Sequence, residues 1–267
     1  MKQVFLFLFL FIGLSNLIAK DISTYLIGSY VDAKDASQRL QDAGFEVLAS
    51  YESVKDGQTL VFTNEALKNQ GAKTGRAHVA VGRLFIDSKE KKISFTNPVY
   101  FGKAFMQDEY DARVFEQIAE DIKRIFTGLE NSKDKLDEND LEHYHFMMGM
   151  PYYEDSDILA ESSNTELLKK ARTFKKGKEL VFELKISDST TLLGYSLAKR
   201  TKKFVEKIGR QNGAILPYTV CIENGKASAL EAKYYIAVSY PLLTMTTFTT
   251  IATVPGAIKK DLAKAFK

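Results

Sequence analysis

The chain has 267 residues, of which 45% are hydrophobic and 27% are charged, which excludes a disordered or fibrous protein and indicates a globular one. Its net charge of +3 is too small to indicate nucleic acid or an anionic surface as a partner. The single cysteine, Cys221, excludes a disulfide within the chain, and its apolar surroundings predict a small buried side chain rather than a reactive thiol.

The first nineteen residues have the pattern of a secretory signal peptide. Lys2 supplies a positive start, residues 4–14 are almost entirely apolar, and Ala19 is a small residue at the expected cleavage point. The apolar run is shorter than the roughly 20 residues that a membrane-spanning helix needs. We therefore predict a leader at 1–19, a mature chain without a transmembrane segment from Lys20, and export to the periplasm.

Residues 20–129 predict a first unit of mixed helices and strands. A strand at 23–31 precedes Asp32, which is expected to cap a helix that ends at Gly44. Period-two alternation and helical spacing of apolar residues indicate the rest of the unit. The further strands are expected at 45–51, 59–63, 77–87 and 92–96, and the further helices at 64–70, after Pro98 and at 110–129.

An acidic segment at 130–165 follows this unit. Eleven carboxylates occur from Glu130 to Glu166 against two lysines, whereas thirteen Lys or Arg residues occur from Lys169 to Arg210. We favour a solvated linker followed by a basic helix face. The alternative is an acidic segment that folds over the basic half and shields it.

Residues 166–267 predict a second unit. A strand at 179–187 and a helix at 196–208 precede a hairpin, whose turn is Asn224-Gly225. The uncharged stretch 234–258 is rich in Thr and β-branched residues, which favours buried sheet over a membrane-spanning helix. The hairpin strands are expected at 215–223 and 226–232, and a last helix at 255–266.

The two units share short stretches of sequence. Leu84-Phe85-Ile86-Asp87 parallels Val220-Cys221-Ile222-Glu223, and the helical pattern at 118–126 parallels that at 258–266. A hairpin followed by an amphipathic helix, found twice, suggests a tandem repeat, and chance similarity is the alternative. The expected fold class is α+β, with two related modules of mainly antiparallel sheet and packed helices, joined by the acidic segment.

The first hairpin and the helix after it resemble a bacterial family known as Domain of Unknown Function number 302. The resemblance rests on Val81–Ile86, on Thr96-Asn97-Pro98-Val99-Tyr100-Phe101, and on the Gly44-Phe45 turn into a strand. Residues 215–232 resemble a second, diverged copy, in which Glu231-Ala232 replaces Asn97-Pro98. The resemblance implies a small fold of sheet and packed helices, and it implies no established chemistry.

Most catalytic signatures are missing from the sequence. Gly71-Ala72-Lys73-Thr74-Gly75 lacks the spacing of a phosphate loop, and no nucleophile elbow occurs. His78 lies in a predicted strand, where a structural imidazole is favoured over a catalytic one. The basic run 199–203 could bind anions, although a solvated helix face is the favoured interpretation.

One segment, residues 143–153, is rich in His and Met. His143, Met147 and Met150 share a face if this segment is helical, whereas His143, His145 and Met147 do so if it is extended. Imidazole and thioether ligands suit Cu(I), so these four residues are candidate copper ligands. The favoured alternative is a plug of Met, Phe and Tyr that packs between the two units.

Together these patterns favour an exported, non-catalytic binding or accessory protein. Its partner would be a small ligand or a periplasmic protein held in the groove between the units, with no cofactor expected and no nucleic acid. A periplasmic copper-handling protein is the second hypothesis. An enzyme of unknown class is the third, because the sequence shows no nucleophile–base pair and no cofactor motif.

Overall fold

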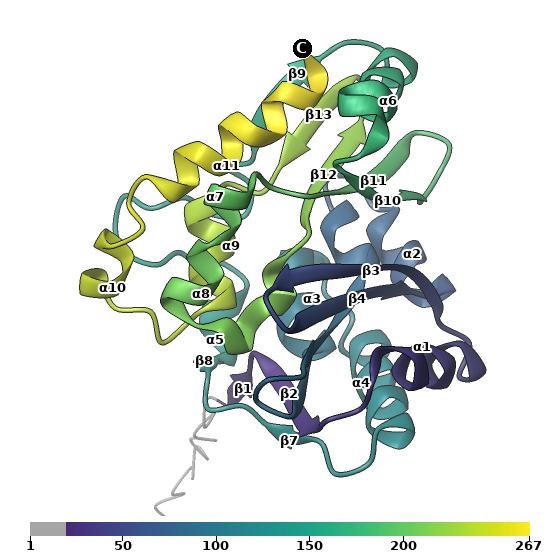
Figure 1. Cartoon of the computed structure of the whole chain (residues 1–267), viewed down its shortest axis with the longest axis vertical. Coiled ribbons are helices and arrows are strands. Elements are labelled where there is room, and N and C mark those ends of the chain that lie inside the picture. The colour runs from purple at the N-terminus through teal and green to yellow at the C-terminus, as the bar shows by residue number, and fades with distance from the viewer. Residues whose placement is uncertain (1–19) are drawn as a thin grey trace, which may run out of the picture.

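Two antiparallel sheets with packed helices form the structure, a computed structural model that describes residues 20–267 (Figure 1). The α+β class expected from the sequence is thereby confirmed. The first sheet contains, in spatial order, β3 (Glu46–Val54), β4 (Gly57–Thr63), β5 (Gly82–Asp87), β6 (Lys92–Thr96), β2 (Tyr25–Ser29) and β7 (Glu130–Asn131). The second contains β10 (Leu180–Lys185), β11 (Thr190–Tyr195), β12 (Tyr218–Glu223), β13 (Lys226–Ala229) and β9 (Asp157–Glu161).

Helices connect and cover both sheets, and in Figure 1 the first half of the chain lies below the second. In the first half they are α1 (Ala33–Asp42), α2 (Glu65–Gly71), η1 (Ala77–Ala80), α3 (Pro98–Met106), η2 (Gln107–Glu109) and α4 (Ala112–Ile125). Strand β1 (Asp21–Ser23), at the start of the described residues, pairs with β8 (Lys135–Asp137) in a two-stranded ribbon. Helix α5 (Glu138–Leu141) follows β8, and both lie between the two halves in the sequence. In the second half they are α6 (Asn164–Thr173), η3 (Phe174–Gly177), α7 (Lys199–Lys202), α8 (Phe204–Ile208), η4 (Arg210–Ile215), α9 (Ala232–Ser239), α10 (Met245–Thr249), α11 (Val254–Ala263) and η5 (Lys264–Phe266).

Side-chain caps place the helix starts where the sequence predicts them. Asp32 accepts hydrogen bonds from the backbone N–H groups of Lys34 and Asp35, both at 3.0 Å, and so begins α1. Asn64 caps α2 in the same way, and Asn97 caps α3 with Pro98 in its first turn. Each cap satisfies donors that the first turn of a helix leaves unpaired, which fixes where the chain turns from strand to helix.

The two sheets share one strand order. In the first sheet the spatial order is β3-β4-β5-β6-β2, and in the second it is β10-β11-β12-β13-β9, so strands in the same place follow each other in the same chain order. Strand β7 is an additional strand at the edge of the first sheet. Each central hairpin leads into a capped helix, α3 behind Asn97 and α9 behind Glu231. The last strand pair before the turn is Asp87–Lys92 in the first hairpin and Glu223–Lys226 in the second. Asp87 of β5 therefore corresponds to Glu223 of β12, and the preceding residues of the two strands correspond in order.

Two stretches differ from the sequence-based expectation. Residues 77–80 form the 3₁₀ helix η1 rather than the start of a strand. The uncharged stretch 234–258, expected as buried sheet, contains α9, α10 and the start of α11. Nearly all of α9 is buried, so tertiary packing outweighs its β-propensity, and Thr244 caps α10 through the N–H of Thr247.

Within residues 20–267, none of the helices has the length and apolar character that crossing a bilayer requires. The predicted leader, residues 1–19, lies outside the described residues.

The acidic segment 130–165 is built into the fold rather than forming a separate linker. Strand β7 joins the first sheet, β8 pairs with β1, and β9 forms the edge of the second sheet. The acidic composition indicated a solvated linker, but acidic side chains can remain in water while the backbone of the same residues pairs with a neighbouring strand. The second half therefore starts by Asp157, earlier than the predicted boundary at 166.

Two reciprocal hydrogen bonds join the halves through α3 and α9. Tyr100 donates to the carbonyl oxygen of Val238 at 2.8 Å, and Tyr234 donates to that of Ala104 at 2.9 Å. Both tyrosines are the third residue of their helix and both carbonyls belong to the seventh. All four residues belong to one continuous core that includes residues of both halves.

Replacing either interface tyrosine by phenylalanine should destabilise the whole chain. Tyr100→Phe and Tyr234→Phe each remove a buried hydrogen bond, so each should lower the free energy of unfolding by about 1–2 kcal/mol. Urea denaturation measures this change. The control is Tyr30→Phe, since the Tyr30 side chain is exposed. Equal stability of all three variants would show that the hydrogen bonds between the halves contribute nothing.

Candidate functional site

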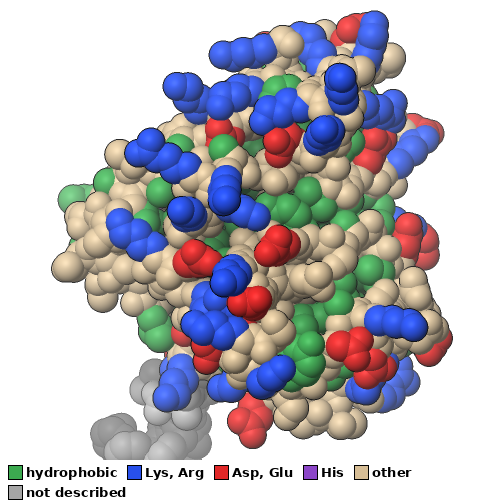
Figure 2. All heavy atoms as spheres, viewed as in Figure 1, with side chains coloured by type: hydrophobic (Ala, Val, Ile, Leu, Met, Phe, Trp, Pro, Cys, Tyr) green, Lys and Arg blue, Asp and Glu red, His purple; other side chains and the backbone are tan. Residues whose placement is uncertain are grey.

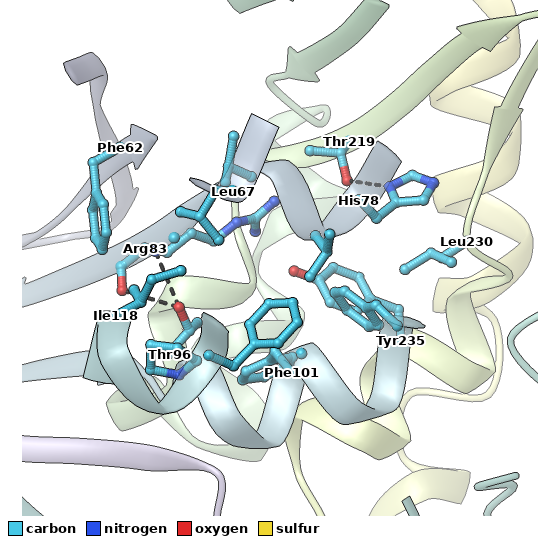
Figure 3. A pocket seen from close by; sticks show the side chains of 17 residues that line it. Phe62, Leu67, His78, Arg83, Thr96, Phe101, Ile118, Thr219, Leu230 and Tyr235 are labelled. Carbon is cyan, nitrogen blue, oxygen red and sulfur yellow. Dashed lines mark hydrogen bonds between the residues drawn. The ribbon is translucent and has the colours of Figure 1, made fainter. Parts of the chain in front are cut away.

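A cavity of about 30 Å³ lies where the two halves meet (Figure 3). Elements η1, β5, α3 and α4 border it from the first half, and β12, α9 and Leu230, which follows β13, border it from the second. Such a volume accommodates one or two water molecules. Its polar side chains are His78, Arg83, Thr96, Thr219 and Tyr235, and its larger apolar ones are Phe62, Leu67, Phe101, Phe105, Phe115 and Ile118.

Gly82 lets the Phe62 ring pack close to the backbone at the wall of the cavity. Gly82 is paired with Phe62 of β4, and a Cβ atom on Gly82 would lie 2.4 Å from the Phe62 ring. The corresponding residue of the second half is Tyr218, which is paired with Tyr195 of β11. The Tyr218 ring lies 5.3 Å from that of Tyr235, so this position carries a large side chain in the second half and none in the first.

Arg83 is the buried cation of the site, with only 4% of its surface exposed. Its Nη1 donates to the carbonyl oxygens of Ala214 and Ile215 at 2.9 and 2.7 Å, and its guanidinium lies 5.8 Å from the centre of the Tyr235 ring. Among residues 20–267 no carboxylate forms an ion pair with it. A buried charge without an opposite charge is costly, so the cavity has a local excess of positive charge.

His78 is the second polar group with an unusual environment. It is buried in η1, and its Nδ1 lies 3.0 Å from the hydroxyl oxygen of Thr219 in β12. Burial, and then the charge of Arg83, lower the pKa of His78 to about 3. The imidazole is therefore neutral near neutral pH, and the positive charge of the site comes from Arg83 alone.

The arrangement suits recognition of an anionic group. An arginine fork offers several N–H donors in one plane, and the neighbouring hydroxyl groups of Thr219 and Tyr235 add neutral polar contacts. Cys221 lies in β12 but does not line the cavity, and burial followed by the charge of Glu223 raises the pKa of its thiol. Cys221 is buried, as its sequence environment predicts.

The four candidate copper ligands have different surroundings. His143 is exposed, with Nε2 3.7 Å from Asp108, and the ring of His145 lies 4.5 Å from that of Tyr152. Met147 is 44% exposed, whereas Met150 packs against the core. In the described part of the chain no group of three or more His, Cys, Asp or Glu side chains is placed to hold a metal ion. The copper site stays a prediction.

The aromatic residues of the same segment pack as the plug interpretation expects. The Tyr144 ring lies 6.4 Å from that of Tyr234, and the Phe146 ring lies 5.9 Å from that of Phe248. Tyr153 is buried and donates to the carbonyl oxygen of Gly75 at 2.8 Å. The segment thus covers the junction of the halves with its aromatic side chains.

Sequence reasoning did not find Arg83, Thr219 or Tyr235 as site residues. The available signal was Arg83 next to the apolar run Leu84-Phe85-Ile86 of β5, because arginine is rarely buried in a strand. His78 was expected as a structural imidazole, and its hydrogen bond to Thr219 agrees with that role.

No family model matches the chain, and no curated protein or solved structure matches it either. The resemblance to Domain of Unknown Function number 302 therefore stays a prediction of the sequence.

Replacing His78 should change how stability depends on pH. The unfolded histidine binds a proton below pH 6.5, whereas the folded one stays neutral down to about 3. Stability should therefore fall as pH drops through this window, by at most about 1.4 kcal/mol per pH unit from this group. His78→Asn keeps a polar atom near Thr219 and should flatten the curve.

Urea denaturation between pH 7.5 and 4.5, values set by the pKa of about 6.5 of free histidine, measures this dependence. His143→Asn is the matched control, since His143 is exposed and should leave the slope as in the unmodified protein. An unchanged slope in His78→Asn would contradict the assignment of a neutral buried imidazole.

Proposed function

We propose that the protein is an exported, non-catalytic binding protein with two related α+β units, and that its ligand carries a small anionic head group such as a carboxylate. The head group would enter the cavity between the halves and bind Arg83. The observation that supports this proposal is the burial of Arg83 without a carboxylate partner among the described residues. Export rests on the predicted leader at 1–19.

A carboxylate matches the site in charge and in geometry. Planar guanidinium and carboxylate groups form paired hydrogen bonds, which are among the stronger ones in proteins. Such a ligand would give the buried cation the opposite charge that it lacks, while neutral His78 adds no competing charge. A neutral ligand would leave the buried charge of Arg83 without an opposite charge, so the site favours an anion over a neutral ligand.

The apolar walls indicate what the rest of the ligand is. Phe101, Phe105 and Ile118 line the same cavity as Arg83, so an aliphatic chain would pack against them. As it stands, the cavity holds only one or two water molecules, so it can take the head group, and an aliphatic chain would enter only if these apolar side chains moved apart. A narrow unbranched chain requires the smallest such movement. A short fatty acid is the simplest molecule that combines both properties.

Hexanoate is the probe that tests the proposal, with 1-hexanol as its neutral counterpart. Isothermal titration at neutral pH should show binding of hexanoate and much weaker binding of hexanol. Arg83→Met keeps the apolar length but removes the charge, and should weaken hexanoate binding by about tenfold or more. Arg83→Lys should retain part of the affinity.

Arg124→Met is the control for this experiment, because Arg124 lies on the exposed face of α4. Equal affinity for hexanoate and hexanol, or hexanoate affinity unaffected by Arg83→Met, would reject the proposal. If Arg83→Met does not fold, the ratio of hexanoate to hexanol affinity in Arg83→Lys decides the question.

Copper handling is a second candidate, supported by the exposure of neighbouring thioethers in the His/Met segment. Met147 is 44% and Met148 is 94% exposed, which is unusual for methionine side chains. Titration with Cu(I) under reducing conditions tests this candidate. The double variant His143→Ala/Met147→Leu should bind Cu(I) at least about tenfold more weakly, because it loses two ligands.

His78→Asn serves as the control for copper binding, since His78 lies outside the segment. Micromolar or weaker binding that is the same in the double variant would dispose of the copper candidate.

A further inference from the structure

A second hollow, which we call the basic groove, lies between the end of β3 and helices α7 and α8. Its volume is about 790 Å³, and it is open to solvent. Residues from both halves line it, as they do the Arg83 cavity, but the two sites have no lining residue in common. The charged residues of the basic groove are Lys55, Lys175, Lys199, Lys202 and Lys203 with Glu52, Glu179 and Glu206.

Five lysines and three glutamates line the groove, which leaves it two positive charges in excess. Lys55, Lys199 and Lys203 are exposed, and none forms an ion pair with any residue from 20 to 267. In contrast, Lys175 pairs with Glu179 at 2.9 Å, and Lys202 donates to the backbone carbonyl oxygen of Glu52 at 3.0 Å. The groove therefore presents an excess of positive charge.

The acidic segment does not shield the basic groove. Its carboxylates pair with cations elsewhere, for example Glu138 with Lys103 and Asp157 with Lys259. Apart from the local pair Lys169–Glu166, no ion pair between described residues joins the acidic segment to the basic stretch 169–210. Figure 2 shows Lys and Arg side chains gathered over α7 and α8 and open to solvent. The ion pairs of the described residues thus do not support the shielding alternative, which stays a prediction.

We propose that the basic groove binds a short chain of phosphate groups. Lysine ammonium groups are compact point charges that suit phosphate oxygens, and five lysines line this groove. The volume lies in the range of ordinary small-ligand sites. The excess charge calls for a ligand with more than one negative charge.

The lining residues disfavour nucleic acid as the occupant. Binding of single strands depends on aromatic rings on which bases stack, and within residues 20–267 no aromatic side chain lines the basic groove. The nearby Tyr51 ring is covered by Lys202, whose ammonium lies 5.3 Å from the ring centre. Few apolar side chains are exposed in the groove, which also disfavours a peptide that needs hydrophobic anchors.

Titration calorimetry with tripolyphosphate tests the inference. The unmodified protein should bind it, more weakly as salt is raised, because screening acts on exposed charges. The double variant Lys199→Gln/Lys203→Gln should bind about tenfold more weakly or worse. The control Lys123→Gln/Arg124→Gln removes two cations from the exposed face of α4 and should bind as the unmodified protein does.

Three results would overturn the inference: no binding by the unmodified protein, equal losses in both double variants, or tighter binding of an oligothymidylate that depends on Lys199 and Lys203. Arg83→Met should leave tripolyphosphate binding intact. Failure of the hexanoate experiment and failure of this one are therefore distinguishable.

Discussion

The packing of α3 against α9 is the contact on which the rest of the structure depends. Both helices are almost wholly buried, and each has a tyrosine hydroxyl that needs an acceptor away from water. Each hydroxyl finds it in a carbonyl of the other helix. These bonds help to hold the two sheets in one relative position, and residues of both halves line the Arg83 cavity and the basic groove.

Equivalent places in the two halves carry different chemistry. Arg83 and Thr219 correspond in strand register, and five residues before each lie His78 and Ala214. Long Arg83 meets the backbone at small Ala214, whereas short Thr219 meets the bulky ring of His78. Each large side chain thus packs against a small residue of the other half, so both contacts fit in the same interface. Only the Arg83 contact carries a charge, whereas Arg83, His78 and Thr219 all line the cavity.

Local signals in the sequence predicted much of the fold. Asp32 and Asn64 begin helices because their side chains cap the first turn, and Asn224-Gly225 makes a hairpin because both residues tolerate a positive φ. The prediction of buried sheet for residues 234–258 was wrong. Thr244 caps the short helix α10, and the apolar residues of α9 are buried on nearly all sides of that helix. Propensity could not anticipate that packing.

The candidate site could not be predicted in the same way. Arg83 meets Ala214 across 131 residues of chain, and His78 meets Thr219 across 141. Local sequence patterns do not predict contacts between residues so far apart in the chain. The sign in the sequence was Arg83 beside the apolar residues of β5. The basic run at 199–203 was visible, but its groove depends on residues of β3 that lie far away in the chain.

The core shared by the two halves has a consequence for how the molecule unfolds. Because buried hydrogen bonds join α3 to α9, and because one core includes residues of both halves, neither half has a complete surface of its own. A fragment that ends at the boundary between the halves would expose buried aromatic residues of this core, such as Tyr100 and Tyr234, to water. The sequence of the chain resembles two domains, and we expect it to unfold as a single cooperative body.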